Sequence, residues 1–370
     1  MTATTQCGEN AVGVVTPAAA RAEFDAEVTY LDTATMGLPP RRSWLALREA
    51  LAEWRAGTAD AVGYDRPLAE ARHAYARLVG VHPSAVAVGS QVSVFAGLVA
   101  ASLPAGSEVL TATGDFTSIL FPFLAQSGRG VTVREVPLER IADSVTPRTT
   151  LVAVSAVQSA DGRVIDLDGL HAATEATKTK VLLDTTQAIG WLPVDASRFA
   201  YTACGGYKWL LSPRGTAYFT LRPELIDDLV PHTAGWYAGQ SPWTSIYGGP
   251  LRLAADARRF DVSPAWHAWV AAGPAVSLLT QVGTGPLHRH ALGLANRFRA
   301  RAGLEPGNSA IVSLAVGDGT AAAMAAARIA GSSRAGRLRL SFHISTSEAD
   351  VDRAIDILRP HILPGHLAPR

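Results

Sequence analysis

The chain has 370 residues, 48% of them hydrophobic, and its 33 basic residues nearly balance its 32 acidic residues. This length and apolar content suffice for one large domain and a smaller one, and the balanced charge argues against nucleic acid as a partner. The two cysteines, Cys7 and Cys204, provide neither a disulfide framework nor the spacing of a metal site. Because the sequence has no signal-peptide pattern and no apolar run of about 18 residues, we expect a cytoplasmic protein without metal or membrane contact.

The first 30 residues predict an arm rather than a separate folded unit. Residues 1 to about 20 are small and polar, without a hydrophobic period, and we expect residues 1–30 to contribute to the smaller domain. The segment 28–40, VTYLDTATMGLPP, predicts a turn at its glycine and proline pair. Residues 42–56 and 66–79 have the apolar spacing of helices.

From residue 85 onward, short apolar runs alternate with helical patterns, which is typical of βαβ units and a mainly parallel sheet. The predicted fold is therefore α/β. We expect a mainly parallel seven-stranded sheet in a large domain over residues 31–265 and a smaller α+β domain over residues 266–370. The predicted strands are residues 85–88, 108–111, 131–136, 150–155, 180–184, 199–204 and 216–221.

Asp184 and Lys208 occupy positions where such a sheet presents reactive side chains. Asp184 ends the apolar run at 181–183, and a buried parallel strand delivers such an acid to the carboxyl edge of the sheet. Lys208 lies further along, in GYKWLLSPRG, in a tight connection between two predicted strands. A desolvated lysine amine has a lowered pKa and can form a Schiff base with an aldehyde. The alternative is a solvated loop lysine.

These two motifs resemble those of the class V aminotransferases, fold-type I enzymes that use pyridoxal 5′-phosphate. The family pattern is Asp-x-x-Gln or Asp-x-x-His, then a lysine preceded by His or Tyr and followed by Pro-x-Gly, which DTTQ and YKWLLSPRG match. The resemblance implies that Lys208 holds the cofactor, that Asp184 pairs with its ring nitrogen and that Gln187 reaches its phenolic oxygen. It also implies an amino-acid substrate and a phosphate contact from the Tyr207 hydroxyl.

Further cofactor contacts are expected at turns that follow predicted strands. The turn GSQVS at 89–93 runs into an apolar helix pattern, so its N–H groups and the positive helix end can bind a phosphate. An ordinary capped helix start is the alternative. By the resemblance, Phe116 stacks on the cofactor ring, with a plain core phenylalanine as the alternative, and Ser159 lies where relatives place an asparagine near the ring hydroxyl. The expected contacts at these turns are Gln91, Val92, Ser93, Phe116 and Ser159.

Two C-terminal motifs and one near the N-terminus imply how the substrate and a second subunit take part. Arg339, in RLRLSFH, matches an Arg-x-Ser motif whose arginine clamps the substrate α-carboxylate; a solvated edge-strand charge is the alternative. Thr35 lies in YLDTATMGLPP, which resembles the YLDxAxxGxxP opening of the family, and the resemblance implies that it lines the carboxylate end of the substrate. Ser263 lies in RRFDVSP, which resembles the RFExGTP stretch of the family, and this resemblance implies contact with the phosphate in the partner subunit and hence a homodimer with shared active sites. A simple Ser-Pro turn is the alternative.

The lack of a cysteine after Lys208 and a closer resemblance reduce the number of candidate reactions. Cysteine desulfurases of this family need a thiol well after the lysine, but the last cysteine, Cys204, precedes Lys208, so that activity is not expected unless the partner supplies the thiol. The chain also resembles the carbon–sulfur lyases of ergothioneine biosynthesis, which act on hercynylcysteine sulfoxide by β-elimination. An epimerase, a kynureninase-like hydrolase and a cofactor-free relative are the alternatives.

Aromatic residues gather in the Gly/Ser-rich segment 232–250, at Trp236, Tyr237, Trp243 and Tyr247. Aromatic faces attract a trimethylammonium group, so this segment predicts a substrate loop in which Trp236 and Tyr237 bind the substrate. Core or interface packing is the alternative.

Overall fold

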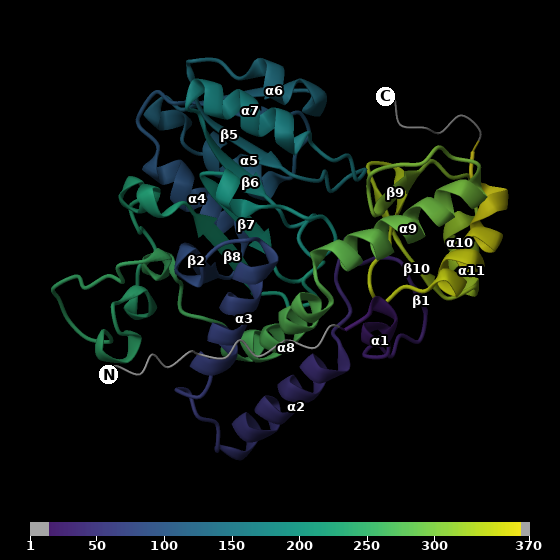
Figure 1. The fold of residues 1–370 in the computed structure, drawn as a ribbon, viewed down its shortest axis with the longest axis horizontal. Helices are drawn as coiled ribbons and strands as arrows, with labels where there is room; N and C mark the ends of the chain where they lie inside the picture. Colours follow the sequence, from purple (N-terminus) through teal and green to yellow (C-terminus); the bar gives the residue numbers. More distant parts are fainter. Residues whose placement is uncertain (1–14, 364–370) are drawn as a thin grey trace, which may run out of the picture.

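The computed structural model describes residues 15–363. At its centre lies a seven-stranded sheet with the strand order β2-β8-β7-β6-β5-β3-β4 (Figure 1). Neighbouring strands are parallel from β7 to β4, whereas β8 runs antiparallel to β2 and to β7. The predicted mainly parallel sheet is confirmed, and the ends of its strands differ from the predicted ones by at most two residues. They are β2 (Val86–Gly89), β3 (Glu108–Ala112), β4 (Thr132–Val136), β5 (Thr149–Ser155), β6 (Lys180–Asp184), β7 (Tyr201–Gly205) and β8 (Ala217–Leu221).

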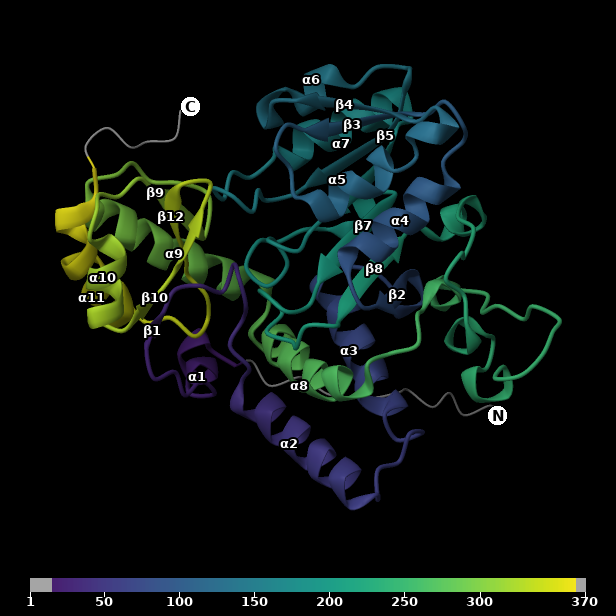
Figure 2. The same cartoon turned by 180° about the vertical axis from the view of Figure 1, so that it is seen from behind.

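Helices cover both faces of this sheet, as the two opposite views show (Figures 1 and 2). The reason is that the strands are apolar on both faces: in β6, Val181 and Leu183 belong to one core cluster and Leu182 to the other. The first cluster is covered by α3 (Asp65–Leu78), α6 (Ile141–Ser144), α7 (Leu167–Thr177) and α8 (Trp266–Val282), and the second by α4 (Val92–Ser102) and α5 (Thr117–Leu124).

Helix α8 packs with the large unit rather than with the smaller one. Trp269, Ala272 and Val276 share the core cluster of α3 and the sheet, and α2 (Arg41–Ala56) also packs against α8. Helix α8 thus packs with the large unit although it follows the predicted boundary at 265–266, because its apolar face is buried against α3 and the sheet; the predicted domain bounds stay a prediction. The smaller unit has its own core and contains α9 (Thr284–Ala302), β9 (Ile311–Leu314), α10 (Thr320–Ala326), β10 (Ile329–Ala330), β11 (Ser332–Arg334), β12 (Arg337–Ser341) and α11 (Glu348–Leu358).

The N-terminal segment joins the smaller unit. Strand β1 (Thr29–Tyr30) pairs in parallel with β10, and Leu31 is buried in the core of that unit. Helix α1 (Pro17–Arg21) contacts α8 and α9. Residues 32–37 then lead to the carboxyl edge of the large sheet, where the Gly37 N–H donates to the Tyr207 carbonyl over 2.9 Å. The remainder of the predicted arm, residues 1–14, lies outside the described residues.

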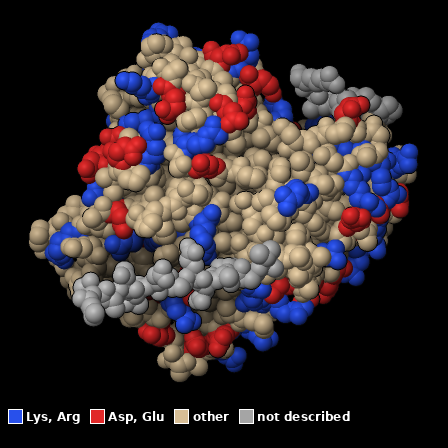
Figure 3. Space-filling view, viewed as in Figure 1, with Lys and Arg blue, Asp and Glu red and all other residues tan. Residues whose placement is uncertain are grey.

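Positive and negative side chains are interspersed over the face seen in Figure 3. Within residues 15–363, no helix combines the length and apolarity needed to span a membrane. The same residues contain no group of three or more His, Cys, Asp or Glu side chains gathered as metal ligands.

Candidate active site

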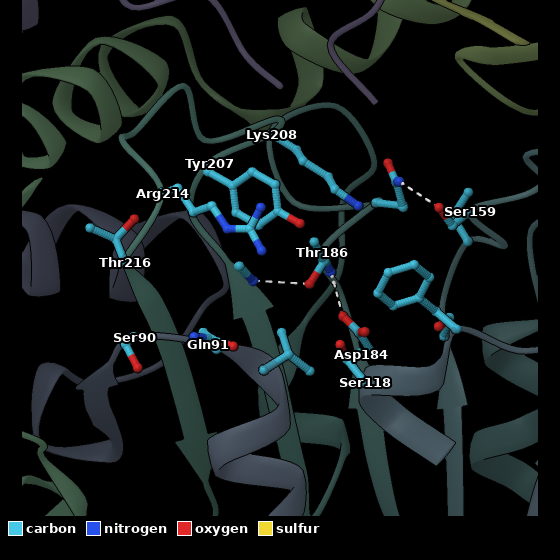
Figure 4. Close-up of a pocket in the computed structure, with 16 residues that line it drawn as sticks. Ser90, Gln91, Ser118, Ser159, Asp184, Thr186, Tyr207, Lys208, Arg214 and Thr216 are labelled. Atoms are coloured by element: carbon cyan, nitrogen blue, oxygen red, sulfur yellow. Dashed lines mark hydrogen bonds between the residues drawn. The ribbon is translucent and has the colours of Figure 1, made fainter. Parts of the chain in front are cut away.

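A cavity lies at the carboxyl ends of β5, β6 and β7, where the turns that follow these strands meet (Figure 4). It contains about 730 Å³ of open space, including the solvent at its mouth. This is the edge at which open α/β sheets bind ligands. The predicted site residues that line it are Gln91, Val92, Phe116, Ser159, Asp184, Gln187, Tyr207 and Lys208.

Lys208 extends into this cavity from the turn after β7 (Figure 4). Its side chain is buried, and this burial lowers its pKa to about 8, against the opposing effect of the Asp184 charge; the Arg339 charge lowers the pKa further. The Lys208 Nζ atom lies 5.4 Å from the ring centroid of Phe116 and 5.5 Å from that of Tyr207. An amine with this lowered pKa is available as a base or a nucleophile near neutral pH.

The turn that carries Lys208 is fixed by the close approach of Gly37. A Cβ atom on Gly37 would overlap the Lys208 carbonyl oxygen and crowd the Leu211 side chain. Leu211 itself has a left-handed backbone, with φ of 57°, and its N–H donates to the Lys208 carbonyl over 3.1 Å. The glycine of the N-terminal motif is therefore required by packing against the lysine turn.

Asp184 presents a buried carboxylate at the end of β6. Burial raises the pKa of Asp184 to about 6, hydrogen bonds from Thr186 oppose this shift, and the Asp115 charge adds to it. The Thr186 N–H donates to Asp184 Oδ1 over 2.9 Å, and Thr186 Oγ1 accepts from the Gly205 N–H over 2.9 Å. These bonds connect the turns after β6 and β7 and hold the acid in place for a cationic or protonated partner.

Asp115 is a buried acid that orders the turn before α5. It accepts hydrogen bonds from the Phe116 N–H over 2.7 Å and from the Ser155 N–H and hydroxyl over 2.8 and 2.5 Å. This fixes the backbone of Phe116, whose side chain is 44% exposed and lines the cavity. The alternative of a core phenylalanine at this position is therefore wrong.

Gln187 connects the cavity to the N-terminal segment. Its Nε2 donates to the Ala34 carbonyl over 3.0 Å and to Ser159 Oγ over 3.2 Å, and its Oε1 accepts from Trp209 Nε1 over 2.7 Å. Both N–H groups of the amide thus have partners already. A contact between Gln187 and a ring oxygen would require one of these bonds to open, and that contact stays a prediction.

Arg339 lies beside the cavity with its guanidinium against Ser159 and Thr35. Its Nη1 donates to the Ser159 carbonyl and hydroxyl, and its Nη2 donates to Thr35 Oγ1 over 2.7 Å. Within residues 15–363 its acidic partner is Asp32, at 3.9 Å, and Arg339 Nε has no hydrogen-bond partner. Burial lowers the pKa of Arg339 to about 10. A buried guanidinium with a free donor is suited to bind a carboxylate; Arg337, by contrast, bonds to β9.

The opposite end of the cavity is formed by the start of α4. Ser90, Gln91 and Val92 line it, and Gln91 does not cap the helix with its side chain, so the first-turn N–H groups can bind an anion. Ser93 is not a lining residue, because the helix begins at Val92, earlier than the predicted pattern at Val94, and places Ser93 inside its first turn.

Three predicted contacts lie away from this cavity. Ser263 is exposed and does not line it. The rings of Trp236 and Tyr237 pack against each other with centroids 5.0 Å apart, and the buried Tyr237 donates its hydroxyl proton to Asp65. These three residues do not meet Lys208 within one chain, so a role in cofactor or substrate binding would require a second chain.

Comparisons with known proteins agree on one family. The model of the family described as aminotransferase class-V matches residues 65–306. The chain belongs to this family. The class V chain is 27% identical to the uncharacterised aminotransferase YcbU of Bacillus subtilis (strain 168) over 308 residues, 77% of this chain and 81% of that protein. It is 26% identical to isopenicillin N epimerase of Streptomyces clavuligerus over 383 residues, 90% and 95% of the two chains.

A solved structure establishes the fold type of this class V chain. The cystine C-S lyase C-DES, in complex with its product cysteine persulfide, matches it with a TM-score of 0.81 at 20% identity, covering 91% of this chain and 99% of that one. The fold is therefore that of the fold-type I pyridoxal-phosphate enzymes.

Class V aminotransferases use pyridoxal phosphate, and the residues of the cavity fit this cofactor. Lys208 offers an amine of lowered pKa, and Asp184 offers a buried carboxylate that can pair with the ring nitrogen. The N–H groups at the start of α4 offer a site for the phosphate.

Three further residues, which the sequence pattern did not single out, lie at or near this cavity. Arg214 and Thr216 line it, and the Arg214 guanidinium lies 5.5 Å from the ring centroid of Tyr207 (Figure 4). Arg334 donates to Thr35 Oγ1 over 3.1 Å beside Arg339. The position of Arg214 and Thr216 in the turn that carries Lys208 could have indicated that they lie at the cavity. No sequence feature indicates the position of Arg334, because only strand pairing brings it to Thr35.

Proposed function

We propose that this class V enzyme is a pyridoxal-phosphate-dependent carbon–sulfur lyase that acts on hercynylcysteine sulfoxide in ergothioneine biosynthesis. Its products would be the sulfenic acid form of ergothioneine, pyruvate and ammonia. The observation that carries the proposal is the arrangement of Lys208, an amine in the cavity with its pKa lowered to about 8, and Arg339, a buried guanidinium with a free donor that contacts the lining residue Ser159. This arrangement supports removal of a proton from the Cα of an amino acid.

Each of the three side chains has a separate role in the proposed β-elimination. Pyridoxal phosphate, when bound, supplies the electron sink that acidifies the Cα–H bond of the substrate. Arg339 would hold the α-carboxylate, Asp184 would pair with the ring nitrogen and Lys208 Nζ would take the Cα proton. The Cβ–S bond then breaks, its electron pair leaves with the sulfenate, and the three-carbon fragment takes up water to give pyruvate and ammonia.

The state of Cys204 favours a lyase over a cysteine desulfurase. Within residues 15–363, Cys204 is the only cysteine, and it is fully buried. Burial raises the pKa of the Cys204 thiol to about 12. A thiol that is neither exposed nor ionised does not accept sulfur as a persulfide, so it offers no acceptor for desulfurase chemistry.

An aromatic cluster supports recognition of the trimethylammonium group. The ring centroids of Trp236 and Trp243 are 5.1 Å apart, and Asp65 accepts hydrogen bonds from Trp243 Nε1 over 2.6 Å and from the Tyr237 hydroxyl. Aromatic faces beside a carboxylate attract a quaternary ammonium ion. Because the cluster lies away from its own cavity, we propose that it serves the cavity of a partner subunit.

A homodimer with shared active sites is part of this proposal. Large apolar side chains are exposed on α2 and α5, including Trp54 at 65% and Phe121 at 60%, and such side chains support an interface. In the dimer, the exposed Ser263 would reach the phosphate bound by the partner. The cytoplasmic location is likewise a proposal, made from the sequence.

Product analysis separates the lyase from its rivals. Hercynylcysteine sulfoxide, its unoxidised thioether and cysteine are incubated with the holoenzyme, and the products are identified by mass spectrometry. Pyruvate from the sulfoxide supports the lyase. Inversion at Cα without pyruvate would indicate an epimerase, alanine would indicate kynureninase-like hydrolysis, and a colourless protein that binds no aldehyde would indicate a cofactor-free relative.

The aromatic cluster has its own test. Trp236→Ala should weaken the binding of trimethylated substrate while leaving the binding of an unmethylated analogue unchanged. Equal losses for the two compounds would contradict the proposed ammonium site.

A further inference from the structure

Three arginines share one face of the hairpin formed by β11 and β12. In its register Ser332 pairs with Arg339 and Arg334 pairs with Arg337, and residues that are opposite or two apart point to the same side of a sheet. Ala335 and Gly336, with φ of 47° and 74°, form the tight turn that fixes this register. The hairpin therefore brings the guanidinium of Arg334 close to that of Arg339.

Nearly all the polar groups that contact these three guanidinium groups are uncharged. Arg337 bonds to Ser313 Oγ over 3.0 Å, while Arg334 and Arg339 both donate to one hydroxyl oxygen, Thr35 Oγ1, over 3.1 and 2.7 Å. Within residues 15–363, the three arginines make one ion pair, between Arg339 and Asp32 at 3.9 Å. Arg334 makes none within these residues. Like charges held together on a sheet are destabilising, so the face carries more positive charge than its own acids neutralise.

A series of contacts that starts at the cavity reaches Arg339 first and Arg334 last. Ser159 lines the cavity and contacts Arg339, Arg339 contacts Thr35, and Thr35 contacts Arg334. If Arg339 takes the α-carboxylate of an amino acid, as proposed above, Arg334 remains for a group further along the substrate. The Arg334 side chain is half-buried, and the paired N–H donors of its guanidinium match the geometry of a planar anion such as a carboxylate.

We propose that Arg334 binds a second carboxylate of the substrate and makes the enzyme selective for amino acids whose side chains end in an anion. This inference rests on the proposed function, since it assumes that an amino acid occupies the cavity with its α-carboxylate at Arg339. It deepens that function, because hercynylcysteine sulfoxide carries a second carboxylate on its trimethylated histidine part.

The test compares ligands that differ only in this charge. The visible absorbance of the bound cofactor is titrated with S-carboxymethyl-L-cysteine and with its uncharged amide, S-carbamoylmethyl-L-cysteine, and the pair longer by one methylene group is titrated in the same way. The wild type should bind the acid of at least one pair about tenfold more tightly than the amide, the amount expected for a hydrogen bond to a charged group. This readout reports binding and does not require turnover.

Variants of the same hairpin supply the controls. Arg334→Gln should abolish the preference for the acid and leave the affinity for the amide unchanged, Arg339→Gln should weaken both ligands, and Arg337→Gln should preserve the preference. A preference that survives in Arg334→Gln, or a wild type that binds acid and amide equally at both lengths, would overturn this inference alone. If no ligand changes the absorbance of the wild type, binding of an amino acid fails and the proposed function is overturned with it.

Discussion

The indole N–H of Trp209 donates to Gln187 Oε1 over 2.7 Å, and this bond joins the turn that carries the lysine to the turn that follows Asp184. The same amide donates to Ala34 and Ser159. One buried side chain thus connects three segments that are distant in the sequence. The relative placement of Lys208 and Asp184 depends on this connection as well as on the pairing of β6 with β7.

Trp209→Phe tests the connection. The substitution keeps a buried ring but leaves Gln187 Oε1 without its partner, so the free energy of unfolding should fall by about 1–3 kcal/mol and the cofactor should bind less tightly. Urea denaturation and cofactor titration measure the two effects. Trp266→Phe, which removes an indole N–H that has no hydrogen-bond partner, is the matched control and should leave the cofactor affinity unchanged. Unchanged stability in Trp209→Phe would show that the bond does not hold the turns.

Gly37→Ala should displace the lysine turn. The new methyl group would overlap the Lys208 carbonyl oxygen, so we expect a loss of about 1–3 kcal/mol in the free energy of unfolding together with weaker cofactor binding. Gly293→Ala, in α9, is the control, since a Cβ atom there meets nothing within 4 Å; alanine should stabilise that helix slightly. Wild-type stability and cofactor affinity in Gly37→Ala would contradict the close approach.

Lys208→Met should stabilise the cofactor-free protein at neutral pH. Burial lowers the pKa of Lys208 from 10.5 to about 8, so between these pH values the unfolded chain holds a proton that the folded chain has released, and wild-type stability rises with pH. The gain in the free energy of unfolding of Lys208→Met over the wild type should therefore be largest below pH 8. It should decrease by about 3 kcal/mol as the pH approaches 10.5. Urea denaturation across this range measures it. A difference that is constant with pH would contradict the lowered pKa.

Asp184→Asn should lower the pKa of Lys208 further. The Asp184 charge raises the pKa of Lys208, and the pKa of Asp184 itself is about 6, so the carboxylate is ionised when the lysine titrates. The chain has three lysines, Lys178, Lys180 and Lys208, which makes ¹³C NMR of lysine-labelled, cofactor-free protein a direct measurement. Lys208→Arg assigns the signal. An unchanged or raised pKa in Asp184→Asn would show that the two charges do not interact.

The sheet and the centre of the site were predictable because their signals are local. Asp184 ends an apolar run and Lys208 follows one, so the strand pattern alone brings both to the carboxyl edge of the sheet.

The remaining features depend on packing and pairing that the sequence pattern does not encode. The position of Arg334 beside Arg339 follows from the register of β11 and β12. Helix α8 joins the large unit because its apolar face packs against α3, although it follows the predicted boundary in the sequence. Ser93 does not line the cavity, and α4 begins two residues before the predicted pattern.

The rate of pyruvate release from hercynylcysteine sulfoxide, compared between the wild type and Lys208→Ala after both are loaded with pyridoxal phosphate, tests the central claim most directly. We predict rapid release by the wild type, slow or no release from the unoxidised thioether, and loss of release in Lys208→Ala even though it retains the cofactor. Equal rates in the wild type and Lys208→Ala would contradict the role of the lysine, and a cofactor-loaded wild type that releases no pyruvate from the sulfoxide would contradict the lyase.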